Sequence, residues 1–140
     1  MPQQNKLDRP FSGKRTRFIE FMGMQIKEVR SGRSRLCLAV AEEHLNPSGT
    51  VHGGVTFSLV DTSMGMALFA MLDENQMCVT AEIKIHYLAP IADGTITARS
   101  RVIKKGKRLG IIETNVSNED DELVAKALGT YTILNKPLTT

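Results

Sequence analysis

The feature that most constrains the fold is the stretch from His52 to about Met71, which is long enough for a helix of about five turns. Its apolar residues cover every face of that helix: Val55, Phe57, Leu59, Val60, Met64, Met66, Leu68, Phe69 and Met71. A helix that is apolar on all sides is buried within the fold. Because no other long helix is predicted, the strands of the chain must wrap around this one.

Strand-like segments lie on both sides of this helix. A short helical pattern at 13–22 comes first, and the strand candidates are 26–29, 36–40, 77–88, 96–103, 109–116 and 123–134. The acidic run at 118–122 has the composition of a solvated hairpin turn rather than of a metal site. Two strands, a buried helix and four hairpin-linked strands predict an α+β fold with an antiparallel sheet.

The segment 77–88 alternates between apolar and polar residues. Val79, Ala81, Ile83, Ile85 and Tyr87 share one face, and Thr80, Glu82, Lys84 and His86 share the other. A strand places successive side chains on opposite faces of its sheet. The alternation therefore predicts that Thr80 faces away from the apolar side.

Length and charge exclude several classes of protein. The 140 residues are the size of one domain, and we expect a tail at 1–12 and a single domain at 13–136. Eighteen Lys and Arg against 15 Asp and Glu give a formal charge of +3, too small to demand a nucleic-acid partner. The most apolar run, from Met64 to Leu72, is far shorter than the roughly 20 residues that span a bilayer. With no secretory leader pattern visible, we expect a cytoplasmic protein that binds neither nucleic acid nor membrane.

The cysteines and histidines point to neither a disulfide framework nor a metal centre. Two cysteines, Cys37 and Cys78, are too few for such a framework. His44, His52 and His86 never fall at the short spacings of zinc ligands. We expect no bound metal.

Two glycines, Gly53 and Gly54, open the apolar helix, where glycine costs about 1 kcal/mol relative to alanine. Glycine exposes the backbone N–H groups to close approach, and the helix dipole adds positive potential there. This arrangement suits an oxyanion or another anionic group. The alternative is a flexible loop before a helix that Thr50 or Ser48 caps.

Asp61 is a carboxylate in the middle of the apolar helix. Such a group is costly unless it is hydrogen-bonded or paired, and no Lys or Arg occurs between Arg35 and Lys84. An acid without a local ion-pair partner beside an apolar pocket is a candidate base or nucleophile. The alternative is a buried structural Asp that is bonded to a nearby donor such as Thr62 or a loop amide.

The spacing of these two candidates constrains the assembly. Gly53 and Asp61 are eight residues apart (61 − 53), or about 12 Å along one helix. An oxyanion donor and a nucleophile must both lie about 3 Å from one carbonyl group. If both act on one substrate, two antiparallel helices across a two-fold axis are needed, and the active unit is a homodimer.

Together these residues resemble the signature of hotdog-fold acyl-CoA thioesterases, and most closely that of the bacterial phenylacetate-degradation branch. The resemblance extends over residues 15–135 and rests on Asn46-x-x-Gly49-x-x-His52-Gly53-Gly54 followed by Leu59-x-Asp61. It implies the hotdog fold, an antiparallel sheet wrapped around one long buried helix. It also implies hydrolysis of an acyl-CoA or aryl-CoA thioester by a homodimer that assembles further into a homotetramer. Coenzyme A would be part of the substrate, and no separate cofactor is expected.

The resemblance also assigns roles to individual residues. Asp61 would be the nucleophile or the base that activates water, and the Gly53 amide would stabilise the oxyanion. Gly54 would allow close approach, while Asn46 and His52 would orient the thioester, Asp61 or the water. His52 is equally well explained as a structural histidine at a helix start. Thr80 stands where some relatives place a helper hydroxyl.

The resemblance extends to the two ends of an acyl-CoA molecule. Basic residues would hold the phosphates at a strand turn around Gly106, namely Lys104, Lys105, Lys107 and Arg108. A solvated basic hairpin is the alternative explanation for this cluster. Phe57, Met64 and Leu68 would line the acyl pocket.

Two other functions remain open at this stage. A dehydratase or hydratase acting on a thioester-bound chain would use His52 as base and Asp61 as acid. A non-catalytic acyl-CoA binding module would bind the same ligand without releasing a thiol.

Overall fold

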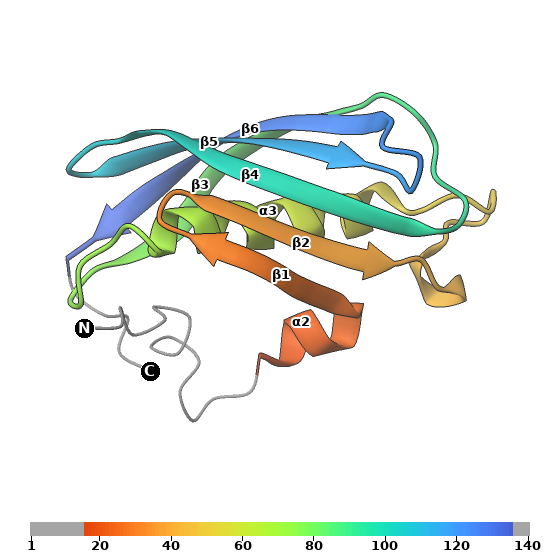
Figure 1. Ribbon diagram of the computed structural model, residues 1–140, viewed down its shortest axis with the longest axis horizontal. Coiled ribbons are helices and arrows are strands. Elements are labelled where there is room, and N and C mark those ends of the chain that lie inside the picture. Colours follow the sequence, from red (N-terminus) through yellow and green to blue (C-terminus); the bar gives the residue numbers. More distant parts are fainter. Residues whose placement is uncertain (1–15, 136–140) are drawn as a thin grey trace.

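The computed structural model describes residues 16–135, and its elements follow the expected order (Figure 1). They are α2 (Arg17–Met22), β1 (Met24–Arg30), β2 (Arg33–Ala39), the 3-10 turn η1 (Glu42–His44), α3 (Gly53–Phe69), β3 (Met77–Tyr87), β4 (Thr95–Lys105), β5 (Leu109–Ser117) and β6 (Leu123–Leu134). The expected tail at 1–12 and the first residues of the expected 13–22 helix lie outside the described part. The 3-10 turn η1 lies between the second strand and the long helix, where no element was expected.

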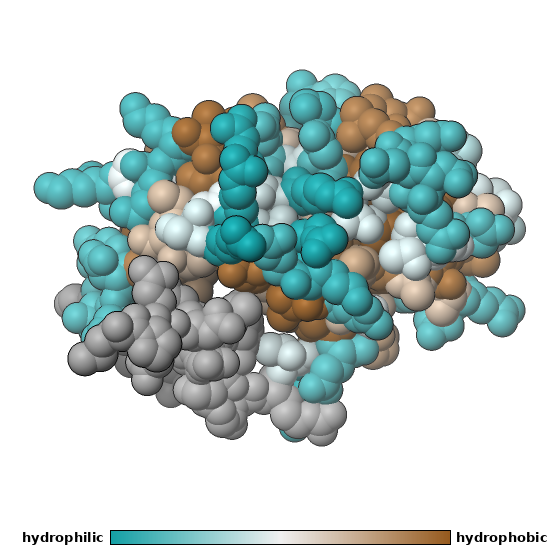
Figure 2. Space-filling view, in the orientation of Figure 1, coloured by the Kyte–Doolittle hydropathy of each residue, from teal (hydrophilic) through white to brown (hydrophobic). Residues whose placement is uncertain are grey.

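The strands form one antiparallel sheet in the order β1-β2-β4-β5-β6-β3. The long helix α3 runs along one face of this sheet, and strands lie alongside its whole length (Figure 1). Hydrophilic residues cover much of the surface in the same view (Figure 2). The α+β hotdog fold is confirmed. None of the helices within residues 16–135 is long and apolar enough to cross a membrane.

The burial of α3 depends on close approach to the sheet. Leu59, Met64 and Leu68 are completely buried. A Cβ atom built on Gly129 of β6 would lie 2.6 Å from the sulfur of Met64, and one on Gly110 of β5 would lie 2.7 Å from Leu68. These two strand positions therefore accept no side chain unless the helix residues above them shift.

A chain of four buried hydroxyl groups fixes α3 on the sheet; we call it the hydroxyl chain. Ser34 of β2 donates to the Ser63 carbonyl at 2.5 Å, and its Oγ lies 2.8 Å from the Ser63 Oγ. The Ser63 Oγ lies 2.7 Å from that of Ser100, which lies 2.7 Å from the Thr114 hydroxyl. Since each hydroxyl has one hydrogen, a single direction satisfies every bond: Thr114 donates to Ser100, Ser100 to Ser63 and Ser63 to Ser34.

The edge strand β3 departs from the expected alternation. Its pairing with β6 shifts between Thr80 and Glu82, so Thr80 pairs with Tyr131 whereas Glu82 pairs with Thr130. This bulge reverses the side-chain direction between the two halves of the strand. The prediction that Thr80 faces away from the apolar side is therefore wrong, because Thr80 reaches Asp61 on the helix side of the sheet. Val79 and Ala81 correspondingly leave the face that Ile83 and Ile85 occupy.

Candidate active site

Asp61 projects from the middle of α3 toward the end of the sheet formed by β6 and β3. Its side chain is half-buried, and Oδ1 accepts hydrogen bonds from Thr80 Oγ1 at 2.6 Å and from the Tyr131 hydroxyl at 2.5 Å. Within residues 16–135, no donor contacts Oδ2 and no cation pairs with the carboxylate. Thr62 is not the partner, because its hydroxyl donates to the Ser58 carbonyl. One oxygen of this acid is held by two hydroxyls, and the other is open within the described part of the chain.

Tyr131 is the partner that the sequence reasoning missed. It lies on β6, is only 2% exposed, and its hydroxyl is also 2.7 Å from the backbone oxygen of Asp61. Burial, and then the hydrogen bond to Asp61, raise the pKa of Tyr131 well above its ordinary range. The only signal in the sequence was a hydroxyl-bearing side chain in a row of apolar strand positions.

Cys78 lies close to the same carboxylate. Burial and the charge of Asp61 raise the pKa of the Cys78 thiol to about 11. Its Sγ lies 3.8 Å from the Gly65 carbonyl oxygen. The neutral thiol is therefore the dominant form at neutral pH, and Cys78 is a poor nucleophile there.

The start of α3 has a capping side chain at His52 and a backbone N–H donor at Gly53. His52 caps α3, because its Nδ1 accepts a hydrogen bond from the Gly54 amide at 2.8 Å. Neither Thr50 nor Ser48, the expected alternatives, provides that cap. No acceptor for the Gly53 amide occurs in the described part of the chain. The first helical N–H group therefore remains available to an anionic ligand.

Asn46 organises the loop before α3. Its Oδ1 accepts from the Ser48 amide at 3.0 Å and from the Thr50 amide at 3.2 Å, and its Nδ2 donates to the Thr50 hydroxyl at 2.9 Å. Gly49 adopts a φ of 83° within this loop. The loop is thus held by specific hydrogen bonds, and most of the Asn46 amide is used within it.

A cavity of about 340 Å³ opens beside the start of α3. The Tyr87 hydroxyl donates to the Gly53 carbonyl at 2.7 Å, and a Cβ atom on Gly53 would lie 3.2 Å from the Tyr87 ring. The remaining lining comes from Thr50, Val51, Thr56, Leu88, Ala89, Pro90, Ile91, Val124 and Ala125. The expected pocket residues are not among them. Met64 and Leu68 are completely buried in the core and Phe57 is only partly exposed, so the acyl-pocket role expected for these three residues stays a prediction.

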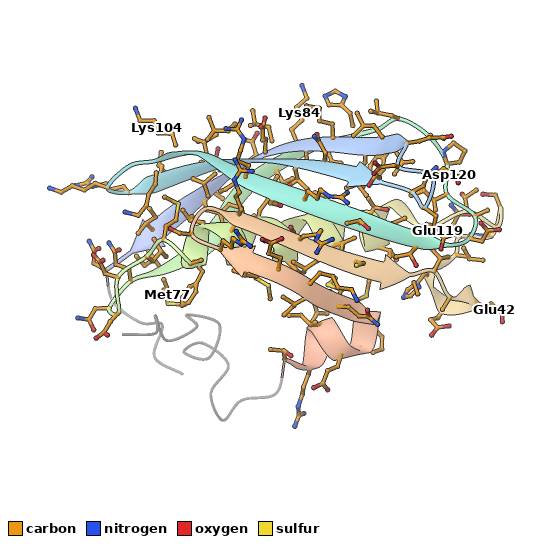
Figure 3. The ribbon with its side chains drawn as sticks, in the orientation of Figure 1. Glu42, Met77, Lys84, Lys104, Glu119 and Asp120 are labelled. Carbon is orange, nitrogen blue, oxygen red and sulfur yellow. The ribbon has the colours of Figure 1, made fainter. Side chains whose placement is uncertain are left out.

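The candidate residues fall into three places in one protomer. Asp61 and Thr80 meet at the middle of α3, whereas Gly53, Gly54, His52 and Asn46 gather at its start. The basic turn, with Lys104, Lys105, Gly106, Lys107 and Arg108, joins β4 to β5. Figure 3 shows Lys104 at this turn, at the opposite end of the molecule from Glu42, which precedes the start of α3. One protomer therefore does not bring these groups together.

Comparison with known proteins identifies the family. The family model described as the thioesterase superfamily matches residues 48–125. A protein of Saccharolobus solfataricus that is named as a candidate esterase is 37% identical over 120 residues, which cover 86% of this chain and 79% of that protein. The 1,4-dihydroxy-2-naphthoyl-CoA hydrolase of Listeria monocytogenes is 26% identical over 84% of this chain and 95% of its own length.

A solved structure agrees with these sequence matches. A variant of the phenylacetic acid degradation protein of Thermus thermophilus superimposes with a TM-score of 0.77 at 25% identity, covering 83% of this chain and 97% of that one. The family model covers more than half of the chain and includes the start of α3, Asp61 and Thr80. The chain therefore belongs to the thioesterase superfamily of hotdog-fold proteins.

Proposed function

We propose that the protein hydrolyses the thioester bond of an acyl-CoA or aryl-CoA, with Asp61 as the reacting carboxylate. The observation that carries the proposal is the hydrogen bonding of Asp61: two hydroxyls hold Oδ1, and Oδ2 has no donor among residues 16–135. Membership of the thioesterase superfamily supplies the reaction class. A relative that is named as a CoA-thioester hydrolase supports coenzyme A as the leaving group.

The proposed reaction needs one base or nucleophile and one oxyanion donor. As a base, Oδ2 takes a proton from water while the water oxygen bonds to the thioester carbon. The carbonyl oxygen becomes an oxyanion that accepts from the Gly53 amide. Collapse breaks the C–S bond, and the proton passes to the leaving sulfur, which gives free acid and CoA thiol. As a nucleophile, Oδ2 bonds to the carbon itself, the thiolate leaves, and water then hydrolyses the mixed anhydride.

The geometry supports a site that is shared between two protomers. Gly53 and Asp61 lie at different heights on one helix, about 12 Å apart at 1.5 Å per residue. An antiparallel partner helix would place the partner's Gly53 beside Asp61 of this chain. The side of α3 that carries Phe57, Ser58 and Asp61 is only half-buried, and in the sheet formed by residues 16–135 β3 is an edge strand. Both features suit a two-fold interface along α3 and β3.

The catalytic role is tested by Asp61→Asn, assayed for thiol release on a panel of aryl-, short-, medium- and long-chain acyl-CoAs. We expect a loss of about 100-fold or more in kcat, as for removal of a base or nucleophile. The matched control is Asp73→Asn, the same change at an exposed acid beyond the end of α3. Unchanged turnover in Asp61→Asn would refute the proposal. A double bond that forms or disappears without thiol release would indicate a dehydratase or hydratase, and tight binding without turnover a binding module.

The shared site is tested by complementation. Gly53→Pro removes the proposed donor, because proline has no N–H, and the first helical position tolerates proline. The added Cβ atom requires the Tyr87 ring, 3.2 Å away, to shift by a few tenths of an ångström. His52 already has the extended backbone that precedes proline comfortably, with φ −58° and ψ 134°. When Gly53→Pro and Asp61→Asn chains are refolded together, half of the dimers are mixed and each mixed dimer has one intact site. We expect about a quarter of wild-type activity to return. No recovery, with mixed dimers shown to form, would contradict a shared site.

A further inference from the structure

The two donors to Asp61 Oδ1 come from neighbouring strands at one level of the sheet. Thr80 of β3 and Tyr131 of β6 are direct partners in the strand register. The bulge that follows Thr80 directs its side chain toward α3, on the same side of the sheet as the buried Tyr131. The two hydroxyls consequently reach one carboxylate oxygen at 2.6 and 2.5 Å.

Tyr131 is suited to act as a permanent donor. Its hydroxyl carries one hydrogen, and both Oδ1 and the backbone oxygen of Asp61 are within hydrogen-bond distance. Because its pKa is raised by burial and by Asp61, the phenol stays protonated across the neutral range. The hydroxyl thus ties side chain and backbone of Asp61 to β6.

We propose that Tyr131 is a positioning residue for the proposed hydrolysis: together with Thr80 it holds Oδ1 of Asp61, so that Oδ2 is the oxygen that reacts. The inference rests on the proposed function, since it concerns how Asp61 is presented to water or thioester. Tyr131 itself touches no reacting atom in this scheme. Its contribution is to fix the rotation of the carboxylate about its Cβ–Cγ bond.

The titratable groups beside Asp61 are Cys78 from β3 and Tyr131 from β6. Burial raises the pKa of both groups, so both stay neutral near pH 7.

The test is Tyr131→Phe, measured as kcat and KM on the substrate selected from the acyl-CoA panel. We expect kcat to fall about 10-fold with KM changed less than about two-fold, because substrate binding is kept while the reacting oxygen is held less firmly. The matched control is Ser100→Ala, which removes a hydroxyl from the hydroxyl chain on the other side of α3. It should lower Tm and leave kcat within about two-fold of the wild-type value.

A second pair of variants keeps the test valid if Tyr131→Phe does not fold. Thr80→Val removes the other donor at an exposed edge-strand position, and Thr80→Ser restores a hydroxyl. We expect kcat to fall in the first and to return in the second, with KM changed little in both. An unchanged kcat in Tyr131→Phe, or in Thr80→Val where the former is unfolded, would overturn the inference. If Asp61→Asn is inactive in the same assays, the proposed function survives that result; if Asp61→Asn is fully active, the function itself fails.

Discussion

Two polar clusters are centred on Asp61 and Ser63, two residues apart on α3. They differ in burial and in how completely their hydrogen bonds are made. The hydroxyl chain around Ser63 is buried on the sheet side, and each of its hydroxyls has a partner. The cluster around Asp61 projects about 200° away around the helix and is half-buried, and one carboxylate oxygen has no donor among residues 16–135. The same helix thus carries one cluster whose hydrogen bonds are complete and one that leaves an acceptor open within the described part of the chain.

This difference distinguishes a polar group that stabilises the fold from one that is available for a reaction. A buried hydroxyl with every hydrogen bond made contributes stability, and losing one partner leaves the other unsatisfied at a cost of about 1–3 kcal/mol. An acid held at one oxygen only retains a free lone pair that can take a proton or attack carbon. The two clusters should therefore respond oppositely to mutation, one in stability and the other in activity.

The largest expected effect is a loss of activity when the cluster around Asp61 is changed. Asp61→Asn keeps the shape of the side chain and should lower kcat by about 100-fold or more while changing Tm little. Thermal unfolding followed by circular dichroism, alongside the thiol-release assay, measures both quantities. A large fall in Tm would show that Asp61 stabilises the fold, as the hydroxyl chain does, and would contradict the distinction between the two clusters.

The next largest effect is a loss of stability when the hydroxyl chain is changed. Ser63→Ala removes the hydroxyl that joins Ser34 to Ser100, and we expect a loss of about 1–3 kcal/mol in the free energy of unfolding, because both neighbours lose a partner. The measurement is urea unfolding at constant m-value. Activity should stay within about ten-fold of wild type. A stability change below about 0.5 kcal/mol would mean that water or a rotated hydroxyl replaces the lost bonds.

The same contrast explains how far the sequence could be interpreted. The place of α3 was predictable because its apolar coverage is a local pattern, and Asp61 was conspicuous because a carboxylate in such a helix is costly. Thr80 was assigned to the wrong face because strand alternation holds only until a bulge, and the bulge depends on the pairing with β6. Tyr131 lies 70 residues from Asp61, so only the folded register brings the two together.

The hydroxyl chain was beyond prediction for a similar reason. Each of its members is a small polar residue in a strand or helix, and nothing in the spacing of Ser34, Ser63 and Ser100 announces that they meet. The basic turn illustrates the opposite difficulty. Its composition was evident, but in the folded chain it lies far from the start of α3, and composition alone does not place a turn relative to other residues.

The smallest effect that we expect is a change in the alkylation rate of Cys78, which reports on the negative charge of Asp61. Its pKa of about 11 means that about 0.1% of the thiol is ionised at pH 8, so alkylation by iodoacetamide should be slow and should accelerate steadily up to about pH 11. Asp61→Asn removes a negative charge that raises this pKa, so the alkylation rate at pH 8 should increase, by less than the effect of burial, which is the larger cause. Ser63→Ala, which changes no charge, is the control, with unfolding excluded by measuring Tm on the same samples. An unchanged rate in Asp61→Asn would mean that the charge of the carboxylate has little effect on the pKa of Cys78. Asp61 would then be more exposed to solvent than its hydrogen bonds to Thr80 and Tyr131 indicate.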